Sequence, residues 1–207
     1  MKNKKILILV EAALCIALST ALSFLSIYKS PFGGDVTLAA CLPIALLSYR
    51  RGVPVGIAAG LVNSIIQLLL GLNNLSYATG AWSAIAIVAL DYIVPFTIIG
   101  CAGMFRRFNK TNTKGLQMIT FGSGIAVVLI ARYICHIFSG GIVWYGLTVS
   151  WGVEEGSLIA TFLNHPWIYS TVYNGLYMVP EIVITTVAGI VLASFLCLTN
   201  DRFSFKK

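Results

Sequence analysis

The chain has 207 residues, of which 58% are hydrophobic and only 10% are charged, and its formal net charge at pH 7 is +7. Soluble domains carry about 25% charged residues, so this composition excludes an ordinary soluble protein and makes the lipid bilayer the expected solvent. The excess of cations does not indicate nucleic-acid binding, because lysines and arginines lie at the ends of apolar runs rather than along one stripe.

Six apolar runs predict membrane helices, for which about 20 apolar residues are needed. In chain order we expect helices at residues 5–28, 36–50, 53–72, 80–104, 115–140 and 167–198. The first run is too long for the h-region of a signal peptide, so it should remain as a span. The second is short, contains Pro43 and follows Gly33 and Gly34. It is either a span or a broken helix packed on protein. Residues 1–207 should form one domain, an all-α membrane protein with a compact bundle of six transmembrane helices.

The cations alternate between the gaps, and this predicts the orientation of the chain. Twelve of the 14 lysines and arginines lie before the first run, after the second, after the fourth and after the last: Lys2, Lys4, Lys5, Arg50, Arg51, Arg106, Arg107, Lys110, Lys114, Arg202, Lys206 and Lys207. The other gaps hold Lys29 as their only cation, beside Asp35, Glu154 and Glu155. By the positive-inside rule, both termini should be cytoplasmic.

The first predicted helix carries a stripe of small residues. Ala13, Ala17 and Ala21 lie at intervals of four, with Ser19 and Thr20 beside them. Small residues at this spacing let helix backbones approach closely in lipid. The stripe is either a packing face within the bundle or a docking face for another membrane protein.

Ionisable residues inside the predicted spans define the candidate site, because such groups are costly at membrane depth unless they face the protein interior. These residues are Glu11, Asp91, Arg132, His136 and Glu181. Asp91 and Tyr92 lie near the middle of the fourth helix, where Pro95 removes the amide that would bond the Asp91 carbonyl. Glu11 and Glu181 lie nearer the inner half, where structural pairing is the expected role.

Two rows of residues spaced by four predict two walls of one pocket. The fifth helix carries Arg132, His136, Gly140 and Trp144. The sixth carries Tyr169, Tyr173, Tyr177 and Glu181, with Asn174 adjacent to the row. Between them lies an outer segment, Tyr145 to Pro166, which is either a lid over an external site or an interfacial loop anchored by Trp151 and Trp167.

The combined inventory suits a flat, nitrogen-rich cation. Aromatic faces attract a cation by roughly 0.5 to 2 kcal/mol each, and Asp91 would supply the matching charge. Asn174 can donate and accept at one planar edge, so it can read the hydrogen-bond pattern of a heteroaromatic ring.

Each of these residues also has a structural alternative. Asp91 and Arg132 could neutralise each other as a structural pair. His136 could be an ordinary interior histidine, and Tyr173 and Tyr177 could be packing residues with hydrated hydroxyls. The co-occurrence of these residues on neighbouring helices is what favours a site.

Catalytic and metal-binding motifs are absent from the sequence. There is no G-x-x-x-x-G-K-[ST] phosphate loop, so the chain should not hydrolyse ATP alone. Neither H-E-x-x-H nor G-x-S-x-G occurs. The five cysteines lie within apolar runs without C-x-x-C spacing, which is typical of small buried hydrophobic residues. We therefore expect no enzyme, no cofactor and no metal site.

Taken together, these residues resemble the thiamine-specific substrate-binding subunit (ThiT or YuaJ) of energy-coupling factor (ECF) vitamin transporters, over nearly the whole chain. The resemblance rests on the order and intervals of several short segments. They are Glu11-Ala12-Ala13 through Ala17, Leu42-Pro43-Ile44 through Arg50-Arg51-Gly52, Asp91-Tyr92, Arg132-Tyr133 with His136, Gly140 and Trp144, and Tyr169 with Asn174-Gly175.

The resemblance implies a six-helix S component in a bacterial plasma membrane that captures thiamine from outside. It would deliver thiamine together with a transmembrane coupling protein (the T component) and two cytoplasmic ATPases. Carried over by residue, it implies that ligand contacts come from Asp91, Tyr92, Arg132, His136, Gly140, Trp144, Tyr169 and Asn174, with Tyr173 added from the sixth-helix row. The small-residue motif that docks the coupling protein matches Ala13 and Ala17, and Ala21 continues the stripe.

The chain departs from this family at two aromatic positions. A tryptophan that some members place before the second helix would fall near Gly34, and the aromatic between the third and fourth helices is either Tyr77 or Trp82. Three rival functions remain open: an S component for a thiamine precursor or another vitamin, a proton-coupled carrier using Asp91, Arg132 and His136, and an intramembrane enzyme.

Overall fold

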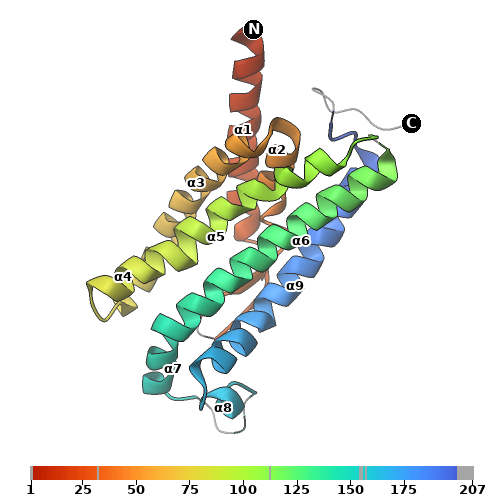
Figure 1. The fold of residues 1–207 in the computed structure, drawn as a ribbon. Helices are drawn as coiled ribbons and strands as arrows, with labels where there is room; N and C mark the ends of the chain where they lie inside the picture. Colours follow the sequence, from red (N-terminus) through yellow and green to blue (C-terminus); the bar gives the residue numbers. More distant parts are fainter. Residues whose placement is uncertain (1, 32, 112, 154–155, 157, 200–207) are drawn as a thin grey trace.

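Nearly all of the described chain is helical (Figure 1). The computed structural model describes residues 2–31, 33–111, 113–153, 156 and 158–199. Its elements in chain order are α1 (Lys2–Ser23), β1 (Ser26–Lys29), β2 (Asp35–Thr37), α2 (Leu42–Arg51), α3 (Val53–Leu70), η1 (Leu72–Tyr77), α4 (Ala81–Ile87), η2 (Val88–Ile93), α5 (Val94–Thr97), η3 (Ile98–Phe108), α6 (Lys114–Ser139), η4 (Gly140–Trp144), α7 (Tyr145–Trp151), α8 (Leu158–Phe162) and α9 (Pro166–Phe195). Glu154 and Glu155 of the predicted outer segment, and the cations Arg202, Lys206 and Lys207, lie outside the described residues.

Five helical segments of the described chain are long and apolar enough to cross a membrane. They are Lys4–Ser23, Val53–Leu70, Ala81–Phe108, Lys114–Trp151 and Pro166–Phe195, with mean hydropathies between 1.8 and 2.3. The prediction of an all-helical, multi-pass membrane protein is confirmed. The fifth predicted helix is longer than expected, because the helical path continues past residue 140 through η4 and α7.

The second predicted helix is shorter than expected and packs on protein. α2 begins at Leu42 rather than at residue 36, has 10 residues, and seven of them are buried. Ten helical residues rise about 15 Å, roughly half of the hydrocarbon core of a bilayer. Pro43 lies in the first turn of α2, where proline is tolerated because its missing amide would have no helical acceptor. Of the two alternatives for this segment, the structure supports the broken helix.

A short β-hairpin stands where the first predicted helix should end and the second should begin. α1 ends at Ser23 rather than at residue 28, and β1 pairs antiparallel with β2, with Tyr28 opposite Val36. Gly33 and Gly34 in the connection have φ values of 97° and 94°, a conformation that glycine adopts without steric cost. The predicted helix over 24–28 is wrong, because a short apolar run does not distinguish a strand from a helix.

The cation-rich segments meet at one end of the molecule, the top of Figure 1. Arg50 and Arg51 at the end of α2 both donate to Glu11 of α1, at 2.7 and 2.6 Å. Arg106 of η3 donates to the carbonyl of Arg50 at 2.7 Å and to that of Thr199 at 3.4 Å. The structural pairing expected for Glu11 is confirmed. These segments share one end, as their alternation predicts; that this end is cytoplasmic stays a prediction.

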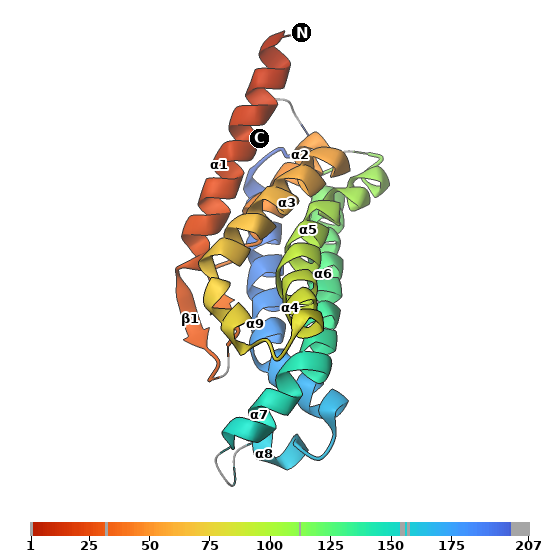
Figure 2. The ribbon, with the colours of Figure 1, turned by 90° about the vertical axis from the view of Figure 1, so that its left-hand side faces the viewer.

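The apolar core surrounds α2, near the cationic end (Figures 1 and 2). Ile44, Leu47 and Tyr49 of α2 are fully buried and belong to one cluster with Phe121 and Ile125 of α6. Figure 2 shows the hairpin, labelled at β1, and the connection before α4 in the opposite half of the bundle. Because the tight packing is concentrated at the cationic end, the other half of the bundle can accommodate a cavity.

Candidate functional site

A cavity of about 370 Å³ lies between the hairpin, η2, α6, η4 and α9. Its volume falls in the range of roughly 300 to 1,000 Å³ that is usual for small-molecule sites. All nine predicted ligand residues line it: Asp91, Tyr92, Arg132, His136, Gly140, Trp144, Tyr169, Tyr173 and Asn174. Residues from three regions of the sequence therefore surround one space, and that space has the size of a small-molecule site.

Two π-helical turns shape the walls of the cavity. In η2, the amide of Val94 donates to the carbonyl of Ala89, one residue beyond the α-helical partner. The widened turn precedes Pro95 and carries Asp91, so the proline that cannot bond the Asp91 carbonyl is accommodated there. In η4, the amide of Tyr145 donates to the carbonyl of Gly140 in the same way. π-turns inside helices occur frequently at functional sites.

Asp91 is the acceptor at the end of a chain of hydrogen bonds. Trp144 donates its indole Nε1–H to Oδ2 of Asp91 at 2.9 Å, and Nδ1 of His136 lies 3.4 Å from Oδ1. Arg132 Nε–H donates to Nε2 of His136 at 3.3 Å. Because a guanidinium can only donate, Nε2 must accept, which leaves the proton on Nδ1 to bond Asp91. His136 is therefore neutral in this arrangement, with its Nδ1–H directed at Asp91.

Arg132 is not the direct partner of Asp91, because His136 stands between them. Its guanidinium lies over the ring of Phe96, 4.4 Å from the ring centroid, and donates to Sγ of Cys41 at 2.9 Å. The alternative of a direct Asp91–Arg132 pair is therefore wrong in this structure. Both residues face the cavity instead.

The tyrosine row of α9 forms the second wall. Tyr169 stacks on Tyr173 with ring centroids 5.8 Å apart, and Tyr173 meets Tyr177 edge-on at 6.4 Å. Tyr169 also bonds the hydroxyl of Thr148 at 2.7 Å. The three rings are almost fully buried and line the cavity, so they offer π-faces to a ligand as well as packing.

Asn174 is largely engaged within the protein. Its Nδ2 donates to the carbonyls of Ser170 at 2.8 Å and His136 at 3.2 Å, and its Oδ1 accepts from the hydroxyl of Tyr177. Both amide hydrogens are therefore occupied, and one lone pair of Oδ1 remains for a ligand. Asn174 can accept a hydrogen bond from a ligand but has no free donor.

The hairpin supplies a wall that the sequence did not predict. Gly33, Gly34, Asp35 and Thr37 line the cavity beside the tyrosine row. A Cβ on Gly34 would lie 2.4 Å from the ring of Tyr177, so only glycine permits this contact. The Gly-Gly pair is a turn signal, but nothing in the local sequence places the turn against a helix more than 100 residues away.

The cavity is also lined by residues that the sequence analysis did not predict as ligand contacts: Gln67, Asn74, Phe96 and Glu181. Asn74 donates to the hydroxyl of Tyr92 at 2.7 Å, which in turn donates to the carbonyl of Gly71 at 3.1 Å. Gln67 and Asn74 do not continue the four-residue spacing that marks the other two walls. The sequence pattern therefore did not indicate that they line the cavity.

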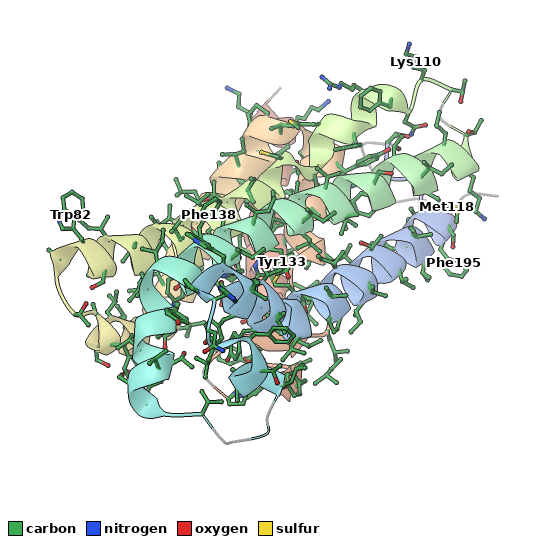
Figure 3. The ribbon with its side chains drawn as sticks, turned by 60° about the horizontal axis from the view of Figure 1, so that its bottom comes forward. Trp82, Lys110, Met118, Tyr133, Phe138 and Phe195 are labelled. Atoms are coloured by element: carbon green, nitrogen blue, oxygen red, sulfur yellow. The ribbon has the colours of Figure 1, made fainter. Side chains whose placement is uncertain are left out.

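The structure distinguishes the two aromatic candidates near the start of α4, although neither lines the cavity. Tyr77 packs edge-on against Trp144 at 6.0 Å and against Trp151 at 5.2 Å. Trp82 is 84% exposed and projects away from the bundle in Figure 3. Tyr77 therefore supports the site through Trp144, and Trp82 lies far from the ligand residues.

No described residue between Tyr145 and Pro166 lines the cavity. Tyr145 packs on Tyr169 with ring centroids 5.6 Å apart, and its hydroxyl donates to the carbonyl of Leu163 at 2.6 Å. Trp151 and Trp167 are about half exposed, as expected of interfacial anchors. The described part of the segment fits the interfacial alternative better than a lid in direct contact with a ligand.

The small-residue stripe of α1 lines a separate, apolar groove. Ala13, Ala17 and Ala21 are exposed and share this groove with Val62 and Ile66 of α3. Only 6% of the apolar window of α1 is buried. The stripe is therefore not filled by packing within the described chain, which leaves the docking alternative open.

Gly140→Ala should destabilise the protein by about 1 to 3 kcal/mol, the usual effect of overpacking. A Cβ there would lie 2.2 Å from Oγ of Ser170 and 2.8 Å from Nδ2 of Asn174, so η4 and α9 must separate. Gly146→Ala is the matched control, because nothing lies within 4 Å of its Cβ position. Thermal unfolding in detergent should show a lower midpoint for the first variant alone; equal midpoints would contradict this packing.

Comparisons with known proteins place the chain in a family. The family model described as "Thiamine transporter protein (Thia_YuaJ)" matches residues 9–200. A curated relative from Bacillus subtilis (strain 168), named thiamine transporter ThiT, is 31% identical over 90% of this chain and 90% of its own length. Another ThiT, from Lacticaseibacillus paracasei, is 26% identical over 99% of this chain and 96% of its own.

A solved structure of ThiT from Listeria monocytogenes is similar in fold, with a TM-score of 0.69, 20% identity, and coverage of 92% of this chain and 95% of that one. At this identity the likeness supports the fold alone. The family match extends over nearly the whole sequence and includes both walls of the cavity. This chain therefore belongs to the thiamine transporter protein (Thia_YuaJ) family.

Proposed function

We propose that the cavity binds thiamine and that the chain is the substrate-binding S component of an ECF-type transporter. Its membership of a transporter family gives it a transport role in the bacterial plasma membrane, not an enzymatic one. The names of the Bacillus and Lacticaseibacillus relatives support thiamine as the ligand. The observation that carries the proposal is the placement of Asp91, a carboxylate held by His136 and Trp144 at the wall of an aromatic cavity.

The charge of the cavity supports a cationic ligand. Among the described residues that line it, Asp35, Asp91 and Glu181 face a single guanidinium, that of Arg132. His136 is neutral in the arrangement described above. An anionic vitamin would meet three carboxylates, and this like-charge repulsion is unfavourable. The permanent positive charge of a thiazolium ring is instead favoured by these carboxylates.

The geometry suggests a role for each group. Asp91 balances the thiazolium charge, and Trp144, His136 and Tyr169 contact the rings of the ligand, with Tyr173 extending the aromatic wall. Asn174 accepts from the exocyclic amino group of the aminopyrimidine through its remaining lone pair, since its own donors are occupied. Tyr92, Arg132 and Gly140 complete the lining of the cavity.

We propose further that delivery requires an ECF coupling protein and two ATPases. The sequence contains no phosphate loop of its own, so the energy of ATP must come from partner subunits. The exposed groove of α1 offers the small-residue surface to which a membrane partner can dock. Release of a charged ligand would then accompany tilting of the whole bundle when the partner engages this groove.

Tryptophan fluorescence tests thiamine binding, because Trp144 lines the cavity and Trp82 does not. Thiamine added to purified protein should quench the emission saturably. Trp144→Phe should remove most of this signal, and Trp82→Phe should leave it intact. Absence of saturable quenching, together with no binding by calorimetry, would refute the proposal. Competition with the isolated pyrimidine moiety distinguishes a transporter for a thiamine precursor, which would prefer that fragment.

A further inference from the structure

Glu181 has an unusual environment for a carboxylate. It lies in the middle of α9, and only 2% of its surface is exposed. In the part of the chain that the structure describes, no guanidinium or ammonium group forms an ion pair with it. A buried carboxylate is costly unless hydrogen bonds compensate for its lost hydration. The hydrogen-bond donors around Glu181 must therefore compensate for the cost of burying its charge.

The principal donors to Glu181 come from the hairpin. Thr37, at the end of β2, donates its backbone amide to Oε2 at 2.7 Å and its hydroxyl to Oε1 at 2.8 Å. Thr185, one turn along α9, adds a weaker contact at 3.5 Å. Both oxygens of one carboxylate thus bind one residue of a segment that is 144 positions away in sequence. Hydrogen bonds to a charged acceptor are about twice as strong as neutral ones.

The hairpin needs such an anchor. Its strands have four and three residues, and an isolated two-stranded hairpin is at best marginally stable in water. Two further contacts with α9 are neutral: the hydroxyl of Tyr173 donates to the carbonyl of Gly33 at 2.8 Å, and Gly34 packs on the ring of Tyr177. Thr37 is therefore the residue of the hairpin that is held by a charged group of the bundle, the carboxylate of Glu181.

We propose that Glu181 is a positioning residue, which latches the hairpin to α9 through Thr37 and so retains the ligand in the cavity. This inference rests on the proposed function. The hairpin forms one wall of the cavity through Gly33, Gly34, Asp35 and Thr37. A ligand can leave through this wall only if the hairpin separates from α9, and separation requires both bonds to Glu181 to break. Entry and exit use the same opening, so the latch slows both dissociation and association.

A direct electrostatic role for Glu181 makes a different prediction, and the conservative variant separates the two. Glu181→Gln removes the charge but keeps an amide that can accept from the Thr37 amide and donate to its hydroxyl. Glu181→Leu removes both the charge and the bonds. If Glu181 acts by position, glutamine should rescue retention in part. If Glu181 acts on the ligand by charge, both variants should lose affinity equally.

The first measurement is thiamine dissociation from purified protein, followed by stopped-flow fluorescence. Glu181→Leu should release thiamine at least about tenfold faster and should also bind it faster, and Glu181→Gln should lie between it and the unmodified protein. Thr37→Val should also accelerate dissociation, because it removes one of the two bonds. Thr185→Val is the matched control, since it removes a contact to Glu181 that does not reach the hairpin.

The second measurement is hydrogen exchange of peptides covering 26–40 without ligand, which tests the latch independently of thiamine. The Thr37 amide should be protected, and Glu181→Leu should raise its exchange at least about tenfold. Unchanged exchange, or equal dissociation rates in Glu181→Leu and the unmodified protein, would overturn the inference. If the unmodified protein bound no thiamine, the proposed function would fail, while the exchange data would still decide the latch.

Discussion

Replacing Asp91 by asparagine should weaken thiamine binding by about 2 kcal/mol or more, roughly 30-fold in Kd. The carboxylate accepts from two residues of one wall, His136 of α6 and Trp144 of η4. Its charge would face the cationic ring of the ligand at short range. An amide keeps the shape of the side chain but removes this charge.

The substitution also disturbs the hydrogen-bond chain. Asp91 accepts on both oxygens, and an amide can accept on one side only. Its NH2 group must therefore face either the Trp144 indole N–H or the His136 N–H. If His136 moved its proton to Nε2 to avoid this, that proton would meet the Nε–H of Arg132. Either arrangement leaves two donors facing each other.

Calorimetric titration of Asp91→Asn gives the affinity directly, and Asp35→Asn is the matched control. Asp35 also lines the cavity, but it lies on the hairpin and bonds Ser26 at 3.0 Å. If Asp91 acts by direct contact, the control should lose clearly less affinity. Equal losses would mean that only the total charge of the cavity matters, and unchanged affinity in Asp91→Asn would remove its assigned role.

The two helical walls of the site were predictable because helix geometry is regular. Residues four apart share a face, so Arg132, His136 and Gly140 could be placed together without a structure, as could Tyr169 and Tyr173. Tyr169 and Tyr173 indeed stack on each other. Charged residues in apolar runs must face protein, and this placed Asp91 toward the same interior. The binding role of these residues stays a prediction.

The hairpin wall could not be predicted, because its position depends on long-range contacts. The apolar residues before Tyr28 fit a helix as well as a strand, and the correct assignment depends on pairing with Val36. The carboxylate that holds the wall, Glu181, lies on the last long helix. The bounds of α2 differ from the expected ones, but its alternative as a broken helix packed on protein is supported, because surrounding helices bury it.

The sequence also did not indicate whether Tyr77 or Trp82 packs against the residues of the site. Both precede or begin α4, and both are aromatic. η1 places Tyr77 between Trp144 and Trp151, whereas the first turn of α4 directs Trp82 outward. Only the path of the connecting segment distinguishes them.

Ala17→Trp should leave thiamine binding intact and reduce uptake at least about tenfold. The indole would fill the groove that Ala17 shares with Ala13 and Val62, and a helix of the coupling protein could then no longer approach α1 closely. The groove and the ligand cavity have no lining residue in common. Titration of the purified variant measures binding, and labelled thiamine measures uptake in cells that also express the coupling protein and both ATPases.

Leu14→Trp provides the control that separates docking from a general effect of a large residue on α1. Leu14 lies one turn before Leu18, is 66% exposed, and is not part of the groove. Its substitution places the same indole on the same helix, so effects on insertion or expression should be shared by the two variants. Normal uptake with Leu14→Trp and failed uptake with Ala17→Trp would locate the partner at the groove. If both variants transported thiamine normally, this face of α1 would not be the docking surface, and the partner would have to engage another part of the bundle.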